Sequence, residues 1–468
     1  MIVQLSLMEL RMLRRDPRVG GTLLALALLV LLAFVATAWN NAHDNAGKRA
    51  VAVAERERWL GQGAKDAHSA AHYSIYAFKP ASVLATLDSG IEPFVGQAVW
   101  LEAHKQNDLL YRPQGDYSVL SRAGFAHPAS LLNLFGPLVA FLMAFTVIAL
   151  DRERGTFRFA LGAALRPHSI VMAKFVAVCG LQVALLILPA GIAALVASVA
   201  QHAITFDVVL RIGSWVLAMG VYLSAFTALG IAVCLLARSP RVALVGLLGL
   251  WILLAVALPR WSNSAVEASL PLPSYQSVKQ RIQKEGSSSW AQEISAERER
   301  ELLQRYGVNR REDLPVDLRG AMLDMSERHG YAIFDRILGG FYDQVDAQDH
   351  RYTLWGFLSP SVALHSLSMA LTGSDFTHHR HFIESAESYR RELINRMNAE
   401  LMKNPHNELN AVRPLADARL WQQVEEFQYA APKLGSIWKT VQTAVYALAV
   451  WVLAAAVLLN LAMRRVRP

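Results

Sequence analysis

Six long apolar stretches limit what this chain can fold into, because none of them contains Asp, Glu, Lys or Arg. A helix of about 20 apolar residues is long enough to cross the hydrocarbon layer of a membrane. We therefore predict an all-α membrane protein with six transmembrane helices. The predicted spans are residues 20–39, 129–150, 175–199, 213–236, 242–258 and 441–462.

The composition of the chain agrees with this class. Of 468 residues, 53% are hydrophobic and only 18% are charged, whereas soluble proteins carry about 25% charged residues. The first apolar stretch has some features of a signal peptide, but Glu9 and Asp16 precede it and its length favours a retained membrane anchor. Cys179 and Cys234 lie inside apolar stretches, so they indicate neither a disulfide framework nor a zinc site.

Charge distribution predicts the topology. With six spans, residues 1–19, 151–174, 238–241 and 463–468 share one side, where 14 Lys and Arg face 4 Asp and Glu. The long loops on the other side hold 30 Lys and Arg against 33 Asp and Glu. Positive charge in short segments beside spans marks the cytoplasmic face. We expect a bacterial inner-membrane protein with cytoplasmic termini, periplasmic long loops, a basic charge that meets lipid headgroups and no nucleic-acid partner.

The two long loops, residues 40–128 and 260–435, are too long to be simple connections. Their patterning predicts two mainly helical extracytoplasmic segments with little sheet, and "LSPS" (358–361) and "NPHN" (404–407) separate helices of the second loop. The expected helices are 46–62 and 95–110 in the first loop, and 274–306, 316–348, 376–403 and 417–429 in the second.

Two groups of histidines lie in these loops. His68 and His72 are four residues apart and would share one helix face, as would His378, His381 and Glu384. Such spacings suit a transition metal. The simpler interpretation is histidines that bond to water or to neighbouring helices, since two ligands do not make a metal site. The histidines are therefore metal candidates only, and we assign no metal to the chain.

Several motifs of catalysis and transport are missing from the sequence. There is no G-x-x-x-x-G-K-[ST] loop for nucleotide phosphates and no H-E-x-x-H or G-x-S-x-G motif. No span carries the charged or histidine side chains that ion-coupled transporters place at membrane depth. We therefore expect a non-enzymatic subunit whose energy comes from a partner, and this directs attention to the cytoplasmic segment 151–174.

Residues 151–174 combine a sharp turn with a short helix. Gly155 allows the turn, and "TFRFALGAALR" predicts a helix with Phe157, Leu161 and Leu165 along one side. Pro167 ends this helix, and Ser169 is expected to cap the next one. A short helix between two spans can transmit motion from a cytoplasmic partner. The alternative is a basic turn that only fixes the topology.

The same segment resembles part of the ABC-2 type permeases, the membrane subunits of ATP-binding-cassette transporters. In that family a charged "E-R-E-x-G-T" end of the second span leads into a coupling helix, and a "P-x-S/R…K" entry to the third span follows. The N-terminal "LSLMELRMLRRDPRV" is similar to the family's elbow helix, predicted here over residues 1–19. The matching residues are Asp151, Glu153, Gly155, Thr156, Pro167, Ser169 and Lys174, with Asp151 in place of the commoner Glu.

The resemblance extends to the branch of this family that contains the DUF3526 domain. It rests on "NLFGPLVAFLMAFTVIALDRERGTFRFAL" and "LSPSVALHSLSMALTGSDFTHHRHFIESAESYRREL", together with large loops after the first and fifth spans. Some members of this branch are associated with the maturation of multi-copper enzymes. The resemblance covers most of the chain.

The resemblance implies a permease that bears no cofactor itself. ATP and Mg would be bound by two cassette ATPase subunits, and a second permease, identical or homologous, would complete a dimer. The runner-up is a membrane-anchored scaffold whose outer domain docks a partner, with no transport path. The residues implied to couple to the ATPase are Asp151, Arg152, Glu153, Arg154, Gly155, Thr156, Phe157, Arg158, Leu161, Leu165, Arg166 and Pro167.

Overall fold

Six long apolar helices form one half of the molecule in the computed structural model, which describes residues 1–73, 75–82, 84–112, 127–162, 166–201, 205–287, 290–403, 405, 407 and 415–466. Within these residues all six predicted spans are helices long and apolar enough to cross a membrane, which indicates a multi-pass membrane protein. The spans lie in α2 (Pro17–Leu60), α6 (Pro128–Ala144) with η1 (Phe145–Leu150) and α7 (Asp151–Glu153), α9 (Pro167–Gln201), α10 (Phe206–Leu236), α11 (Pro240–Trp251) with η2 (Ile252–Ala257) and α12 (Leu258–Ser269), and α19 (Trp438–Arg464).

Local capping explains where several of these helices begin. Three of them begin at a residue whose side chain accepts a hydrogen bond from a backbone N–H of the first turn: Asp16 before α2, Thr205 before α10 and Ser239 before α11. Such caps satisfy donors that have no partner inside the helix. Ser169 was expected to cap the third span, but α9 already begins at Pro167, so Ser169 lies inside its first turn. Proline suits this first position because its missing N–H would be unpaired anyway.

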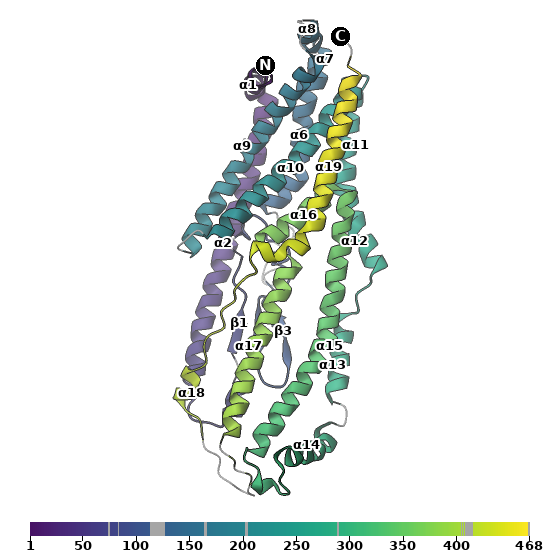
Figure 1. Cartoon of the computed structure of the whole chain (residues 1–468). Helices are drawn as coiled ribbons and strands as arrows, with labels where there is room; N and C mark the ends of the chain where they lie inside the picture. Colours follow the sequence, from purple (N-terminus) through teal and green to yellow (C-terminus); the bar gives the residue numbers. More distant parts are fainter. Residues whose placement is uncertain are drawn as a thin grey trace.

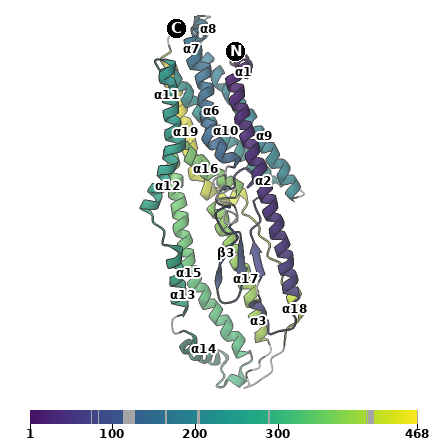
Figure 2. The same ribbon diagram turned by 180° about the vertical axis from the view of Figure 1, so that it is seen from behind.

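The chain places α1 (Ile2–Arg15), α7 and α8 (Thr156–Gly162) at the same end of the bundle as the last turn of α19 (Figures 1 and 2). We call this the proximal end. At the other end α2 continues far past its apolar stretch, so its 44 residues reach about 66 Å. The expected helix 46–62 is therefore the continuation of the first span.

The described residues of the two long loops, apart from α12 and α16, form what we call the distal region (Figure 1). Its helices run largely along the length of the molecule beside the extension of α2. The elements are α3 (Ala67–Ala71), β1 (Ile75–Phe78), β2 (Ala98–Leu101), β3 (Gln106–Leu110), α13 (Tyr275–Ser287), α14 (Trp290–Tyr306), η3 (Arg311–Asp313), α15 (Leu318–Leu354), η4 (Trp355–Phe357), α17 (Phe376–Met402), α18 (Ala418–Gln422) and η5 (Leu434–Ile437).

The predicted helix at 95–110 is wrong, because this stretch forms two strands. The sheet has the order β1-β2-β3, is antiparallel, and pairs Ile75 with Leu101 and Ala98 with Leu110. Its apolar face, with Val99 and Leu101, packs into the core that α17 shares with α2. Strands of four and five residues are too short to show a clear alternating pattern, so tertiary packing decided the conformation.

The second loop follows its expected helices with one departure. The described part of 274–306 is helical in α13 and α14, with residues 288 and 289 outside the described residues, whereas 417–429 is helical only in α18. After α18 the chain is neither helix nor strand up to residue 430. The rings of Phe427 and Tyr429 pack edge-on against Phe382 of α17. These aromatic contacts replace the helix that the charge pattern favoured. Of the "NPHN" breaker, Asn404 and His406 lie outside the described residues.

One helix of the second loop belongs to the membrane half. α16 (Pro360–Thr372) is buried, and its Leu364 and Leu367 join the same hydrophobic core as the spans. Figure 1 shows it at the junction between the bundle and the distal region. Trp215 of α10 donates to Ser368 of α16 at 2.9 Å. α16 therefore joins the two halves of the molecule.

Candidate functional site

The charged segment between the second and third spans forms a turn and a short helix, as predicted. Gly155 has φ +81°, a conformation that costs L-residues with a Cβ about 1–2 kcal/mol. Thr156 donates its hydroxyl to the backbone oxygen of Asp151 across this turn at 3.1 Å. The turn aims α8 away from the bundle at the proximal end (Figure 1).

α8 has one buried face and one exposed face. Phe157 and Leu161 are buried, as their spacing predicted, and Arg158 is exposed. Phe159 is 82% exposed, the most exposed large hydrophobic side chain of the described residues. The sequence did not predict a role for Phe159, because this residue lies off the helix face that Phe157 and Leu161 share by their i, i+4 spacing. Leu165 lies outside the described residues, and Arg166 is exposed just before α9 begins at Pro167.

A buried cluster of charges holds the base of this segment. The Lys174 ammonium of α9 donates to Glu9 of α1 and to Asp151 of α7, both at 2.7 Å. Lys174 and Glu9 are buried and Asp151 is largely so. Burial raises the pKa of Glu9, although the Lys174 charge opposes that rise. One lysine thus joins the first helix, the charged segment and the third span.

A second contact fixes the segment to the fourth span. Arg152 donates to the backbone oxygens of Cys234 and Leu235 at 2.7 and 3.1 Å. These carbonyls belong to the last turn of α10, where backbone oxygens lack partners within the helix and carry partial negative charge. A guanidinium at this position satisfies them, so α7 and α10 are held together.

An open cavity of about 480 Å³ lies beside α8. Phe157 and Leu161 form part of its wall, and the turn between α10 and α11 and the end of α19 form the rest. Its charged lining is mostly cationic: Arg152, Glu153, Arg158, Arg238 and Arg465. The proximal end therefore presents a basic cavity and, on the same short helix that lines it, an exposed phenylalanine, Phe159. Arg154 is exposed on the turn itself.

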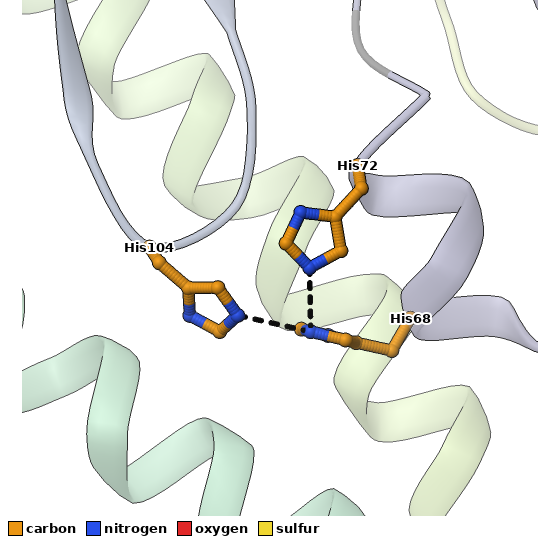
Figure 3. A group of neighbouring side chains, drawn as sticks. All are labelled: His68, His72 and His104. Atoms are coloured by element: carbon orange, nitrogen blue, oxygen red, sulfur yellow. Dashed lines mark hydrogen bonds between the residues drawn. The ribbon is translucent and has the colours of Figure 1, made fainter. Parts of the chain in front are cut away.

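The structure brings one predicted histidine pair together with a third histidine. His68 of α3 and His72, directly after α3, converge with His104, which lies in the turn between β2 and β3 (Figure 3). The His68 Nε2 atom lies 3.1 Å from Nε2 of His104 and 3.2 Å from Nε2 of His72. Nothing in the spacing pointed to His104, which is 32 residues beyond His72 and on a different element.

The other predicted histidine group does not form. His378 lies against the carboxylate of Asp375, whereas Nδ1 of His381 lies 3.3 Å from the Tyr429 hydroxyl. Glu384 accepts from Arg380 at 2.7 Å. These residues share one helix, but each side chain bonds to a different neighbour, so they do not converge on a common point. A hydrogen-bonding role explains them, as the simpler interpretation held.

Residues 276–430 match DUF3526, a domain of unknown function. The matched residues run from α13 through α18 and end just after Tyr429, which contacts Phe382 of α17. The comparison with curated proteins gives no match.

The DUF3526 domain meets the histidine cluster from one side. Its Asn398 and Glu327 hold His68 and His104, whereas the three histidines come from the first long loop, outside the matched residues. The domain also contributes Trp421, which packs edge-on against Trp59 of α2. The two long loops are therefore one folded unit.

Proposed function

We propose that this chain is the membrane-spanning permease subunit of an ATP-binding-cassette transporter. α8 would be the coupling helix that receives a partner cassette ATPase. The observation that carries the proposal is Phe159, an aromatic side chain left 82% exposed on a short helix of the charged segment, whose Phe157 and Leu161 line a basic cavity. Phe157 and Leu161 are buried, whereas Phe159 between them is exposed. This arrangement suits a helix that packs on its own chain by one face and binds a partner by the other.

The contacts behind α8 support force transmission. Lys174 links α7 to α1 and α9, and Arg152 links α7 to α10. A displacement of α8 by the ATPase would therefore reach α1 and two of the apolar helices, α9 and α10, through charge-assisted bonds, which are stronger than neutral ones. The spans would rearrange at the interface with a second permease, identical or homologous, and the energy would come from ATP and Mg on the partner.

The proposal includes an orientation. Positive charge near the proximal end supports a cytoplasmic location for α1, α8 and the end of α19, in a bacterial inner membrane. The distal region with its DUF3526 domain would then be periplasmic. It would receive cargo or transmit movement to an outside partner, in an export or mechanical cycle.

The test is association of the chain with a cassette ATPase from the same organism. We expect purified wild-type permease to retain the ATPase and to change its turnover. Phe159→Ser should weaken the association at least about tenfold, as for a buried aromatic at an interface centre. Phe206→Ser is the matched control, since Phe206 is 77% exposed and begins α10.

Equal ATPase binding by the Phe159→Ser and Phe206→Ser variants would contradict the docking role of α8. A chain that copurifies with no ATPase, and alters no ATPase turnover, would contradict the proposal as a whole. That outcome would favour the second candidate, a membrane-anchored scaffold that docks a periplasmic partner. The size of the distal region, which holds its own hydrophobic core around Trp59 and Trp421, favours this alternative.

A further inference from the structure

Three imidazole nitrogens face one another in the distal region. The Nε2 atoms of His68 and His104 are 3.1 Å apart, and those of His68 and His72 are 3.2 Å apart. All three ligand atoms lie within 4.8 Å of one another. Figure 3 shows the rings converging on one point from α3, the residue after it and the β2–β3 turn.

The outer nitrogens of two of these rings are already engaged. Nδ1 of His68 lies 2.9 Å from the amide oxygen of Asn398. Nδ1 of His104 lies 2.8 Å from the carboxylate of Glu327, whose side chain is 1% exposed. Both partners are acceptors, so each Nδ1 carries a proton, and in the neutral ring this leaves the Nε2 lone pair for a metal ion.

Neutral imidazole is the form that binds transition metals. One metal ion placed where the three rings converge would accept a lone pair from each of them, which suits nitrogen atoms that lie 3.1 and 3.2 Å apart.

The spacing fits a late first-row metal. Zinc lies about 2.0–2.1 Å from histidine nitrogens in tetrahedral sites, which places two ligand nitrogens about 3.3 Å apart. The two separations at His68 are close to this value. His72 and His104 are exposed, so an ion can enter and a fourth position faces solvent.

The surroundings have further features of a metal site. Glu327 and Asn398 act as the acceptors behind two ligands, an arrangement that orients rings in metal sites. His104 has φ +69°, a left-handed conformation that is uncommon outside glycine and that clusters at binding sites. This strained turn delivers the one ligand that is remote in sequence.

We propose that His68, His72 and His104 bind one divalent transition-metal ion of the zinc class through their Nε2 atoms, with an open fourth position. The ion would tie the first long loop to the DUF3526 domain, because the ligands come from the former and their acceptors, Glu327 and Asn398, from the latter. The inference stands apart from the transport proposal, since it concerns the distal region alone.

The experiment uses the full chain, purified in detergent through a tag without histidines, stripped with a chelator and titrated with Co²⁺ and Zn²⁺. We expect one Co²⁺ per chain with the intense visible bands of a tetrahedral site, bands that are lost on adding Zn²⁺. His72→Gln and His104→Gln should abolish these bands. Glu327→Gln, which keeps all three ligands, should weaken binding about 10- to 100-fold.

His350→Gln is the matched control. His350 is an exposed histidine of α15, about 35 Å along that helix from Glu327. His72 and His104 are themselves exposed, so their variants should remain folded, and size-exclusion chromatography checks this. The proposal is overturned if the wild type binds no stoichiometric metal, or if folded His72→Gln and His104→Gln variants bind it as tightly as His350→Gln does.

Discussion

Asp151 and Lys174, the first and last residues of the charged segment between two spans, form an ion pair 2.7 Å long. The pair holds the two ends of the segment together. Lys174 also bonds Glu9 at 2.7 Å, so the segment is fastened to α1. One buried lysine thus connects α1, α7 and α9.

Lys174→Met should destabilise the protein. It leaves the carboxylates of Glu9 and Asp151 unpaired, and removing one member of a buried pair costs about 3–5 kcal/mol, less where a partner is partly exposed, as Asp151 is. We expect a lower midpoint of thermal unfolding in detergent, followed by tryptophan fluorescence.

The control for this prediction is Lys439→Met, which changes an exposed lysine at the start of α19. The double variant Glu9→Gln/Lys174→Met should recover part of the loss, because it removes one of the stranded charges. A midpoint for Lys174→Met equal to that of Lys439→Met would show that the buried cluster has no structural role.

Gly90→Ala should weaken the junction between the first long loop and the turn after α16. Gly90 has φ +45°, and a Cβ there would lie 2.4 Å from the backbone oxygen of the buried Ser374. We expect a loss of about 2 kcal/mol or more in the free energy of unfolding, measured by denaturant titration.

Gly63→Ala is the control that separates backbone strain at a positive φ from the steric clash of the added Cβ. Gly63 has φ +75° but open space where the Cβ would be, so only backbone strain of about 1–2 kcal/mol applies. If Gly90→Ala were no more destabilising than Gly63→Ala, the close approach to Ser374 would not constrain the fold.

Acid should destabilise the distal region through His379. This side chain is 4% exposed, and burial together with the Lys79 charge lowers its pKa from 6.5 to about 3. Between pH 6.5 and about pH 3, His379 is protonated in the unfolded chain but neutral in the folded chain. The full stability is therefore present above pH 6.5 and falls by up to about 2 kcal/mol by pH 5.

His379→Gln removes this proton uptake. We expect the variant to lose less of its unfolding midpoint than the wild type between pH 7.5 and pH 5, while His350→Gln behaves as the wild type does. Parallel pH profiles for all three proteins would mean that His379 does not contribute to acid sensitivity.

Trp421→Ala should open a cavity between the DUF3526 domain and α2. Trp421 is fully buried, packs edge-on on Trp59 with ring centroids 6.0 Å apart, and donates to the backbone oxygen of Gly63 at 3.0 Å. Buried tryptophan truncations cost about 3–5 kcal/mol, and Trp421→Phe should cost less. Trp261→Ala, at a side chain 61% exposed, should change the unfolding free energy by less than about 0.5 kcal/mol.

The apolar spans and the turn at Gly155 could be predicted because each depends on local information. An uninterrupted apolar run needs a membrane or a core wherever it lies, and Phe157 and Leu161 share a helix face by spacing alone. Phe159 escaped notice because nothing in a sequence says which face of a short helix stays uncovered.

The distal region could be predicted only in part. Long helices such as α15 and α17 follow from their periodic pattern, whereas the strands at 98–101 and 106–110 acquire their conformation from pairing with β1 and packing on α17. Four-residue strands gain most of their stability from such non-local contacts, which no window of sequence contains.

The sequence by itself determined the number of apolar helices and the charged segment between two of them, since hydrophobicity and turn chemistry act over a few neighbouring residues. Only the tertiary structure decided that Lys174 would meet Glu9, that His104 would complete the group begun by His68 and His72, and that Phe159 would remain exposed. Each of these relationships depends on packing between elements far apart in the chain, and that packing follows from the burial of the whole fold.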